Sequence, residues 1–146
     1  VQRFHTVRLY AEQYALLVAP GHPFADRAHV SWADAGRLPL CLLTGDMQNR
    51  RIIDRHLADA GVEIPPMLES NSMTMLHVHV RSGLFATIAA VGTGERFAAP
   101  MELIAIPIVE PAVTHEIGLV LKAREPHPPH VSAFLTMARK FAPPSV

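Results

Sequence analysis

The alternation of short apolar runs with amphipathic stretches is the feature that most constrains the fold of this chain. Residues 14–19 form an aliphatic run that stops at Pro20-Gly21, and residues 40–43 form another that ends at Thr44-Gly45. Such runs are typical of buried strands that end in turns. Further apolar runs lie at residues 87–91, 103–108 and 116–122. Because Pro107 cannot donate a backbone hydrogen bond, the end of its run is expected at a sheet edge or beyond the strand.

Three stretches with helical spacing lie between or after these runs. In residues 49–60 the apolar side chains fall on one stripe, Arg50 is expected to project away from it, and Gly61 supplies the stop. Residues 72–81 form the second stretch, and residues 131–141 form a third with a core-facing stripe. That stripe consists of Val131, Phe134, Leu135, Ala138 and Phe141. Strands that alternate with helices predict an α/β domain with a mostly parallel sheet.

Composition excludes several classes of protein. A chain of 146 residues has the length of one domain, and 13 Lys and Arg balance 13 Asp and Glu, so no basic patch for nucleic acid is indicated. No apolar run approaches the ~20 residues of a membrane helix, and no targeting peptide is visible at the start. The single cysteine, Cys41, excludes an internal disulfide and fits a reducing compartment, so we expect a cytoplasmic protein.

The sequence gives little support for catalysis or metal binding. Among nine histidines, His77 and His79 are two residues apart, which would place them on different faces of a helix. His127 and His130 lie in a proline-rich loop, and no HExxH or GxSxG motif occurs. Cys41 lies in an apolar run, where its thiol is expected to be inert. We therefore predict no metal site, no cofactor and no enzymatic activity.

Polar residues at predicted strand ends are more informative. Residues 44–49 follow the apolar run of residues 40–43, and residues 69–72 follow a short predicted strand, Pro66 to Leu68. Each segment leads into a predicted helix. In open α/β sheets, ligands bind beyond the carboxyl ends of strands, near helix N-termini. Alternatively, Asp46, Asn49, Asn71 and Ser72 merely cap their helices. Taken together, the two segments suggest a small polar or anionic ligand.

Several short strings occur in a fixed order along the chain. They are Leu9-Tyr-Ala-Glu12, Gly21-His-Pro-Phe-Ala25, Val30-Ser-Trp-Ala-Asp34, Leu38-Pro-Leu40, Arg81-Ser-Gly-Leu84, Ala86-Thr-Ile88 and Glu116-Ile-Gly-Leu-Val-Leu121. Their order and spacing resemble the effector-binding domain of LysR-type transcriptional regulators over nearly the whole chain. The chain departs from the family pattern at Phe85, where a glycine is expected, and at Ala90, where a proline is expected.

The resemblance implies an α/β domain of the periplasmic-binding-protein-like type 2 fold, with two lobes and a small-molecule effector in the cleft. It implies that residues 1–21 end the first lobe and cross over, residues 22–115 form the second lobe, and residues 116–146 return to the first. The opening strands of the first lobe, and a DNA-binding winged helix-turn-helix with its linker helix, are expected outside this chain. The resemblance implies three kinds of partner, namely a small-molecule effector, operator DNA in the full-length protein, and further copies of the protein in a homodimer or homotetramer. From the polar strand ends described above, we expect the effector to have a carboxylate or other anionic group.

The resemblance also suggests roles for individual residues. The effector-facing residues are expected to be Thr44, Asn49, Asn71, Ser72 and Gly92. The hinge is expected at Ala19, Pro20, Thr114 and His115. Dimer contacts are expected at Ile52, Arg55 and Met67, with ordinary core and surface positions as the alternative. Two other functions use the same fold, namely a solute-binding protein of a transport system and an enzyme such as a dehydratase or deaminase-like domain.

Overall fold

The structure is a computed structural model that describes residues 3–90 and 99–141. These residues form two compact units, one of residues 13–90 and 99–113 and a smaller one of residues 3–12 and 114–141. The strands are β1 (Phe4–Glu12), β2 (Tyr14–Val18), β3 (Val30–Ser31), β4 (Cys41–Leu43), β5 (Leu68–Ser70), β6 (Thr87–Ala90), β7 (Ile104–Val109) and β8 (His115–Lys122). The helices are α1 (Trp32–Gly36), α2 (Gln48–Asp59), α3 (Met73–Arg81), the 3-10 turn η1 (Ala99–Met101) and α5 (Pro129–Phe141).

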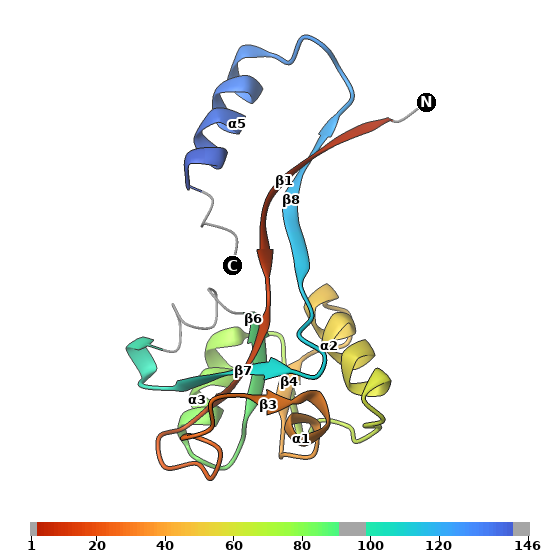
Figure 1. The fold of residues 1–146 in the computed structure, drawn as a ribbon. Helices are drawn as coiled ribbons and strands as arrows, with labels where there is room; N and C mark the ends of the chain where they lie inside the picture. Colours follow the sequence, from red (N-terminus) through yellow and green to blue (C-terminus); the bar gives the residue numbers. More distant parts are fainter. Residues whose placement is uncertain (1–2, 91–98, 142–146) are drawn as a thin grey trace. The chain divides into compact units, whose positions relative to one another are not determined.

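The larger unit contains a mixed sheet. Its strands are ordered β3-β7-β2-β6, and β4 pairs with β5 beside them (Figure 1). The two parts are joined where Leu40 bridges Ala86 in parallel and the Cys41 amide donates to the Ala86 carbonyl at 2.9 Å. Strand β2 is antiparallel to both β6 and β7, whereas β3 is parallel to β7, β4 is parallel to β5, and the bridge makes β6 parallel to β4. Among the described strands of the larger unit only β2 runs in the opposite direction, so the mostly parallel sheet is confirmed, and the antiparallel β2 is the exception that was not predicted. A strand buried on both faces gives the same aliphatic run in either direction, so its pattern does not reveal orientation.

Strand β7 also differs from the expectation drawn from its proline. It lies between β2 and β3 and is therefore an inner strand, and Pro107 stands opposite Ala15 of β2. Pairing with β3 involves only Ile108 and Val109, so Pro107 lies just before the point where that second ladder begins. The exposed proline is tolerated because the ladder on that side is only two residues long.

The core of the larger unit has a layer on each face of the sheet. Leu16 of β2 belongs to a cluster with Trp32 of α1 and Ile53 of α2. Its neighbour Leu17 belongs to a second cluster with Leu76 of α3. Successive side chains of a strand point to opposite faces, so α1 and α2 cover one face and α3 covers the other.

The helix boundaries follow the predicted signals closely. Helix α2 ends at Asp59 before Gly61, and α3 ends at Arg81 before Gly83. Both glycines have positive φ angles, 75° and 82°, which favour glycine at a helix stop. Ser72 caps α3, since its hydroxyl accepts a hydrogen bond from the Met75 amide. The three predicted helices are therefore confirmed, although α5 begins two residues before the predicted stretch, at Pro129.

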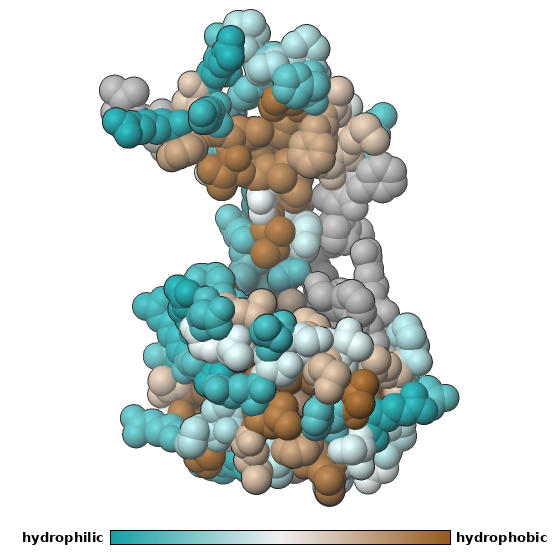
Figure 2. Space-filling view, turned by 180° about the vertical axis from the view of Figure 1, so that it is seen from behind, coloured by the Kyte–Doolittle hydropathy of each residue, from teal (hydrophilic) through white to brown (hydrophobic). Residues whose placement is uncertain are grey.

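The smaller unit is a two-stranded antiparallel ribbon of β1 and β8 together with α5. Of its described residues, Val7 and Leu135 have buried hydrophobic side chains. Phe134 is 57% exposed, so its predicted core-facing position was wrong for the residues that the structure describes. Figure 2 shows hydrophobic residues gathered on this unit. The exposed large hydrophobic residues there are Phe4, Val120, Phe134 and Met137.

The described helices include none that is both long and apolar enough to cross a membrane. The lobe limits at residues 22 and 115 remain predictions. The larger unit itself begins at Gln13, so β2, which was expected to belong to the end of the first lobe and its crossover, pairs within the larger unit.

Candidate functional site

The carboxyl ends of β4, β5 and β6 lie along one edge of the larger unit. Leu43 pairs in parallel with Ser70, so Thr44 and Asn71 follow directly from two neighbouring residues of the ladder. The parallel bridge between Leu40 and Ala86 gives β6 the same direction as β4. Gly92 follows β6 but lies outside the described residues. We call this edge, with residues 44–49 and 70–72 that extend from it, the effector edge.

Thr44 begins a tight loop that leads into α2. The Met47 amide donates to the Thr44 carbonyl at 3.0 Å, and Met47 is the N-cap residue of α2 without a side-chain capping bond. A hydrogen bond from the Thr44 hydroxyl lowers the pKa of the Asp46 carboxyl below its usual value. Asp46 therefore carries its charge in the loop and does not cap the helix.

Asn49 and Ser72 both have structural partners at the effector edge. The Tyr14 hydroxyl donates to Asn49 Oδ1 at 2.9 Å, which ties the first turn of α2 to β2. Ser72 caps α3, as the alternative reading of this residue allowed. Asn71 is exposed and precedes the cap residue. Thr44, Asn71 and Ser72 are thus brought to neighbouring strand ends, while the contribution of each to ligand binding remains a prediction.

Arg50 is a site residue that sequence reasoning missed. It was expected to project away from the apolar stripe, but the residue is only 7% exposed. Its guanidinium forms ion pairs with Asp54, one turn along α2, and with Glu69 of β5. Burial alone favours the neutral form, but the hydrogen bonds to the two carboxylates outweigh it and raise the pKa of Arg50. The spacing of Arg50 and Asp54, four residues apart on one predicted helix, was an available signal for that ion pair. Nothing in the sequence identifies Glu69 as the second partner.

An aromatic cluster in the larger unit includes Tyr14, the hydrogen-bond partner of Asn49. Trp32 packs against His56 of α2, with ring centroids 4.9 Å apart, and makes an edge contact with Tyr14 at 5.8 Å. The Trp32 indole N–H donates to the Pro111 carbonyl at 3.2 Å. The cluster therefore joins α2 to residues near both points where the chain leaves the larger unit, Glu12–Gln13 and Val113–Thr114.

The predicted hinge residues lie at different distances along the chain from the two points where it leaves the larger unit. Thr114 begins the second segment of the smaller unit, and His115 begins β8. Ala19 and Pro20 lie within the larger unit, directly after β2. The hinge itself remains a prediction.

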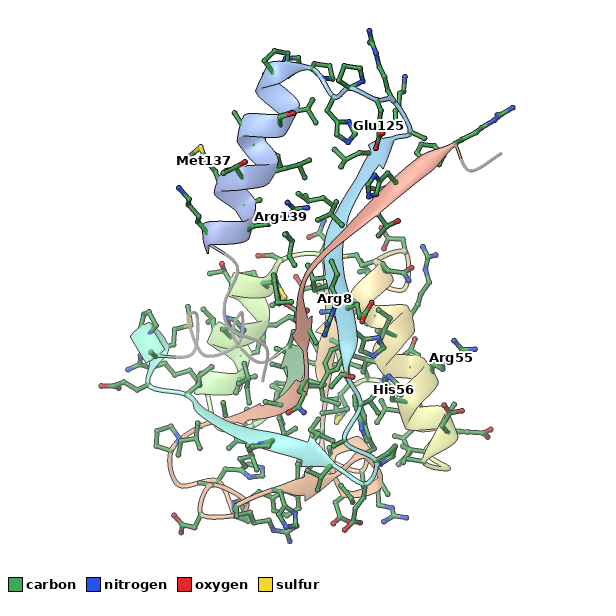
Figure 3. The ribbon with its side chains drawn as sticks, turned by 45° about the horizontal axis from the view of Figure 1, so that its top comes forward. Arg8, Arg55, His56, Glu125, Met137 and Arg139 are labelled. Atoms are coloured by element: carbon green, nitrogen blue, oxygen red, sulfur yellow. The ribbon has the colours of Figure 1, made fainter. Side chains whose placement is uncertain are left out.

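The predicted dimer contacts lie on or near α2 and β5. Ile52 is half-buried and packs against the core, whereas Arg55 is exposed on α2, where Figure 3 labels it beside His56. Met67 is 72% exposed immediately before β5. Ile64, in the connection between α2 and β5, is 55% exposed and adds to the apolar surface there.

The residues capable of covalent or metal chemistry are few in the described ranges. Cys41 is fully buried, and burial raises the pKa of its thiol to about 11, so little thiolate forms at neutral pH. Residues 3–90 and 99–141 contain no group of three or more His, Cys, Asp or Glu side chains able to hold a metal ion. The described effector edge offers hydroxyl, amide and backbone groups together with the charged Asp46 carboxylate, and such polar groups suit reversible binding of a small polar molecule.

Solved structures share this fold. The effector-binding domain of QuiR in complex with shikimate superposes with a TM-score of 0.78 at 17% identity, covering 96% of this chain and 66% of that one. The regulatory domain of CcmR from Synechocystis in complex with 2-PG gives 0.79 at 12% identity, covering 98% and 69%. The chain therefore shares the α/β fold of these two domains, as predicted.

The sequence assigns the family. The model of the LysR substrate binding domain matches residues 1–143, so the chain belongs to this family. A probable nitrogen assimilation transcriptional activator of Synechococcus elongatus is 24% identical over 132 residues, which are 90% of this chain and 43% of the activator. The chain thus spans less than half the length of that relative.

Proposed function

We propose that this chain is the ligand-sensing regulatory domain of a LysR-type transcriptional regulator and binds a small-molecule effector at the effector edge. Membership of the LysR substrate binding domain family supports the role. The observation that supports the place is the parallel pairing of Leu43 with Ser70, which puts Thr44 and Asn71 at adjacent strand ends. Ser72 and Asn49 complete the set, and Gly92 is included from its position after β6.

The effector is a small molecule with a carboxylate or other anionic group. The first turn of α2 has no side-chain cap, so its backbone N–H groups are available to an acceptor, and helix N-termini favour negative charge. Shikimate in QuiR and 2-PG in CcmR are the molecules bound by two proteins of this fold. They are therefore the first compounds to test.

The regulatory mechanism is a shift between two arrangements of the full-length protein. An effector changes this equilibrium only by its difference in affinity for the two arrangements. The chain passes between its units at Val113–Thr114, which favours Thr114 and His115 as hinge residues over Ala19 and Pro20. DNA is bound by a winged helix-turn-helix outside this chain, in a cytoplasmic homodimer or homotetramer with no cofactor and no catalytic step. Ile52, Arg55 and Met67 are proposed as contacts between copies.

A binding screen tests the effector edge. Thermal unfolding is followed with shikimate, 2-PG and a series of small carboxylates, because a ligand at about 100 times its Kd adds roughly 2.7 kcal/mol to the unfolding free energy. For a compound that binds, Thr44→Ala and Asn71→Ala are expected to weaken binding without loss of folding. Asp59→Asn, a change at an exposed position near the other end of α2, is the matched control.

The outcomes distinguish an error in the proposed binding site from an error in the proposed regulatory function. Unchanged affinity in both variants would show that the effector edge is wrong. Binding by the full-length protein that does not alter its affinity for operator DNA would favour a solute-binding protein. Chemical conversion of a bound compound would favour an enzyme.

A further inference from the structure

Five successive backbone carbonyls at the effector edge are hydrogen-bonded, and two arginine side chains bind three of them. Arg50 Nη1 donates to the Leu43 carbonyl at 2.6 Å. Arg51 donates from Nη2 to the Asp46 carbonyl at 2.6 Å and from Nε to the Gly45 carbonyl at 3.4 Å. The Thr44 and Met47 carbonyls accept from the Met47 and Arg51 amides. The loop between β4 and α2 is therefore held by residues of the first turn of α2.

Arg50 extends the same set of contacts to the second segment of the effector edge. The Nη1 atom that donates to Leu43 also donates to Glu69 of β5, and Nε donates to Asp54 at 2.7 Å. Glu69 precedes Ser70, the last residue of β5, after which Asn71 and Ser72 follow. One buried guanidinium thus joins the end of β4, the edge strand β5 and the first two turns of α2.

The energetics of a buried arginine ion pair indicate that Arg50 positions its partners more than it stabilises the fold. Taking a guanidinium and its partners out of water costs several kcal/mol, and an apolar residue of similar volume often gives equal or greater stability. Asp54 and Glu69 keep about half of their side-chain exposure, so their charges remain hydrated if the arginine is removed. The distinctive property of Arg50 is its planar fork, which fixes the directions of several acceptors at once.

We propose that Arg50 and Arg51 are positioning residues of the effector site. Arg51 fixes the backbone of the loop at Gly45 and Asp46, and Arg50 fixes that loop relative to Ser70 and Asn71. Neither side chain needs to touch the effector. The inference rests on the proposed function in one respect, since it is the effector that would use the two segments held in this way.

The test measures backbone order in the absence of any effector. Order parameters of the amides of Gly45, Asp46 and Asn71 are determined by ¹⁵N relaxation in the ¹⁵N-labelled chain. Rigid backbone gives values of about 0.85 and flexible backbone values below about 0.6. Arg51→Ala is expected to lower the values at Gly45 and Asp46 only. Arg50→Met is expected to lower them at Asn71 as well.

A control separates positioning from general loss of stability. Leu57→Val removes one methylene from a buried position of α2, and it is expected to lower stability while leaving the order of all three amides unchanged. If Arg50→Met does not fold, Arg50→Lys keeps the charge but lacks the fork, and the same decrease is expected at the three amides. Unchanged order in the folded arginine variants, or an equal decrease in Leu57→Val, would overturn the proposal.

The result is independent of the proposed function. A looser loop in the arginine variants together with an effector that binds elsewhere would refute the effector edge and leave the two arginines as residues that only order the loop. Effector contacts at Thr44 and Asn71 together with unchanged loop order in the arginine variants would support the effector edge and refute the positioning role.

Discussion

The two units of this chain are built from similar elements but differ in how completely they bury them. In the larger unit, β2 lies between two strands, and its five residues Tyr14–Val18 are all buried. In the smaller unit, β8 pairs with β1 alone, and its eight residues alternate between half-buried and exposed. The difference shows that a strand acquires a two-sided core only when helices cover both faces of its sheet.

This difference decides where a precise site can be built. All described residues assigned to the effector edge belong to the larger unit, where residues of β4, β5 and α2 pack into the two core clusters. A site supported by a packed core keeps its geometry better than one on a thin layer. The ribbon with α5 has few buried apolar contacts, which is typical of regions that open at low free energy.

Truncation of core leucines gives the largest expected contrast. Leu16 is 0% exposed at the centre of the sheet, so Leu16→Ala is expected to lower the unfolding free energy of the larger unit by about 2–5 kcal/mol. Leu135 is 8% exposed on α5 of the smaller unit, and Leu135→Ala should cost much less, because among the described residues of that unit only Val7 is also a buried hydrophobic residue. Residue-resolved hydrogen exchange measures both. Equal losses would contradict the difference between the units.

Two glycines offer a second contrast. A Cβ at Gly36 would lie 2.8 Å from Leu57 Cδ2 and from Val62 Cγ1, both in the core, so Gly36→Ala is expected to cost about 1–3 kcal/mol through overpacking. A Cβ at Gly118 would lie 2.6 Å from the Val7 carbonyl oxygen, so β1 and β8 would have to separate there.

The effect of Gly118→Ala should be confined to the smaller unit. Gly118→Ala is expected to change the amide shifts of β1 and β8 and leave the exchange rates of β2 and β6 unchanged. Faster exchange in β2 would mean that the two units unfold together.

Acidification is expected to weaken the larger unit at α3. His77 is 1% exposed, and burial lowers its pKa below 6.5. The unfolded chain therefore binds a proton that the folded chain resists, so stability decreases as the pH falls below about 6.5, by at most about 1.4 kcal/mol per pH unit for one proton. His77→Gln should reduce this slope, as measured by denaturant unfolding between pH 7.5 and 5.5. Burial also lowers the pKa of His22, so part of the slope should remain.

Sequence patterns predicted the elements of the larger unit better than their arrangement. The aliphatic runs gave β2, β4 and β6, and glycine stops gave the ends of α2 and α3. The mostly parallel sheet was predicted, but the antiparallel direction of β2 was not, because a fully buried run carries no sign of its direction. Strand β1 was not predicted from its pattern, since only Val7 of its nine residues is buried and no regular alternation marks it.

The candidate site was predictable only to the level of segments. Polar residues after two predicted strands indicated the effector edge, because parallel strands bring their carboxyl ends together. The ion pair of Arg50 with Asp54 follows from their spacing of four residues on one helix. The other partners of Arg50, a backbone carbonyl and an acid 19 residues away along the chain, were not predictable. The bond between Tyr14 and Asn49 likewise joins residues 35 apart. Such contacts depend on tertiary structure and leave no local pattern.

The smallest expected effect concerns the ion pair on the ribbon, between Arg8 Nε and Glu116 Oε1 at 3.1 Å (Figure 3 labels Arg8). The two side chains are 54% and 71% exposed, and exposed pairs contribute about 0.2–1 kcal/mol. A double-mutant cycle of Arg8→Ala and Glu116→Ala, followed by exchange of the β8 amides, is expected to give a coupling energy in that range that decreases with added salt. A larger, salt-resistant coupling would show that side chains hold the ribbon. A small one means that the backbone ladder holds it, so the smaller unit depends on strand pairing where the larger unit depends on its core.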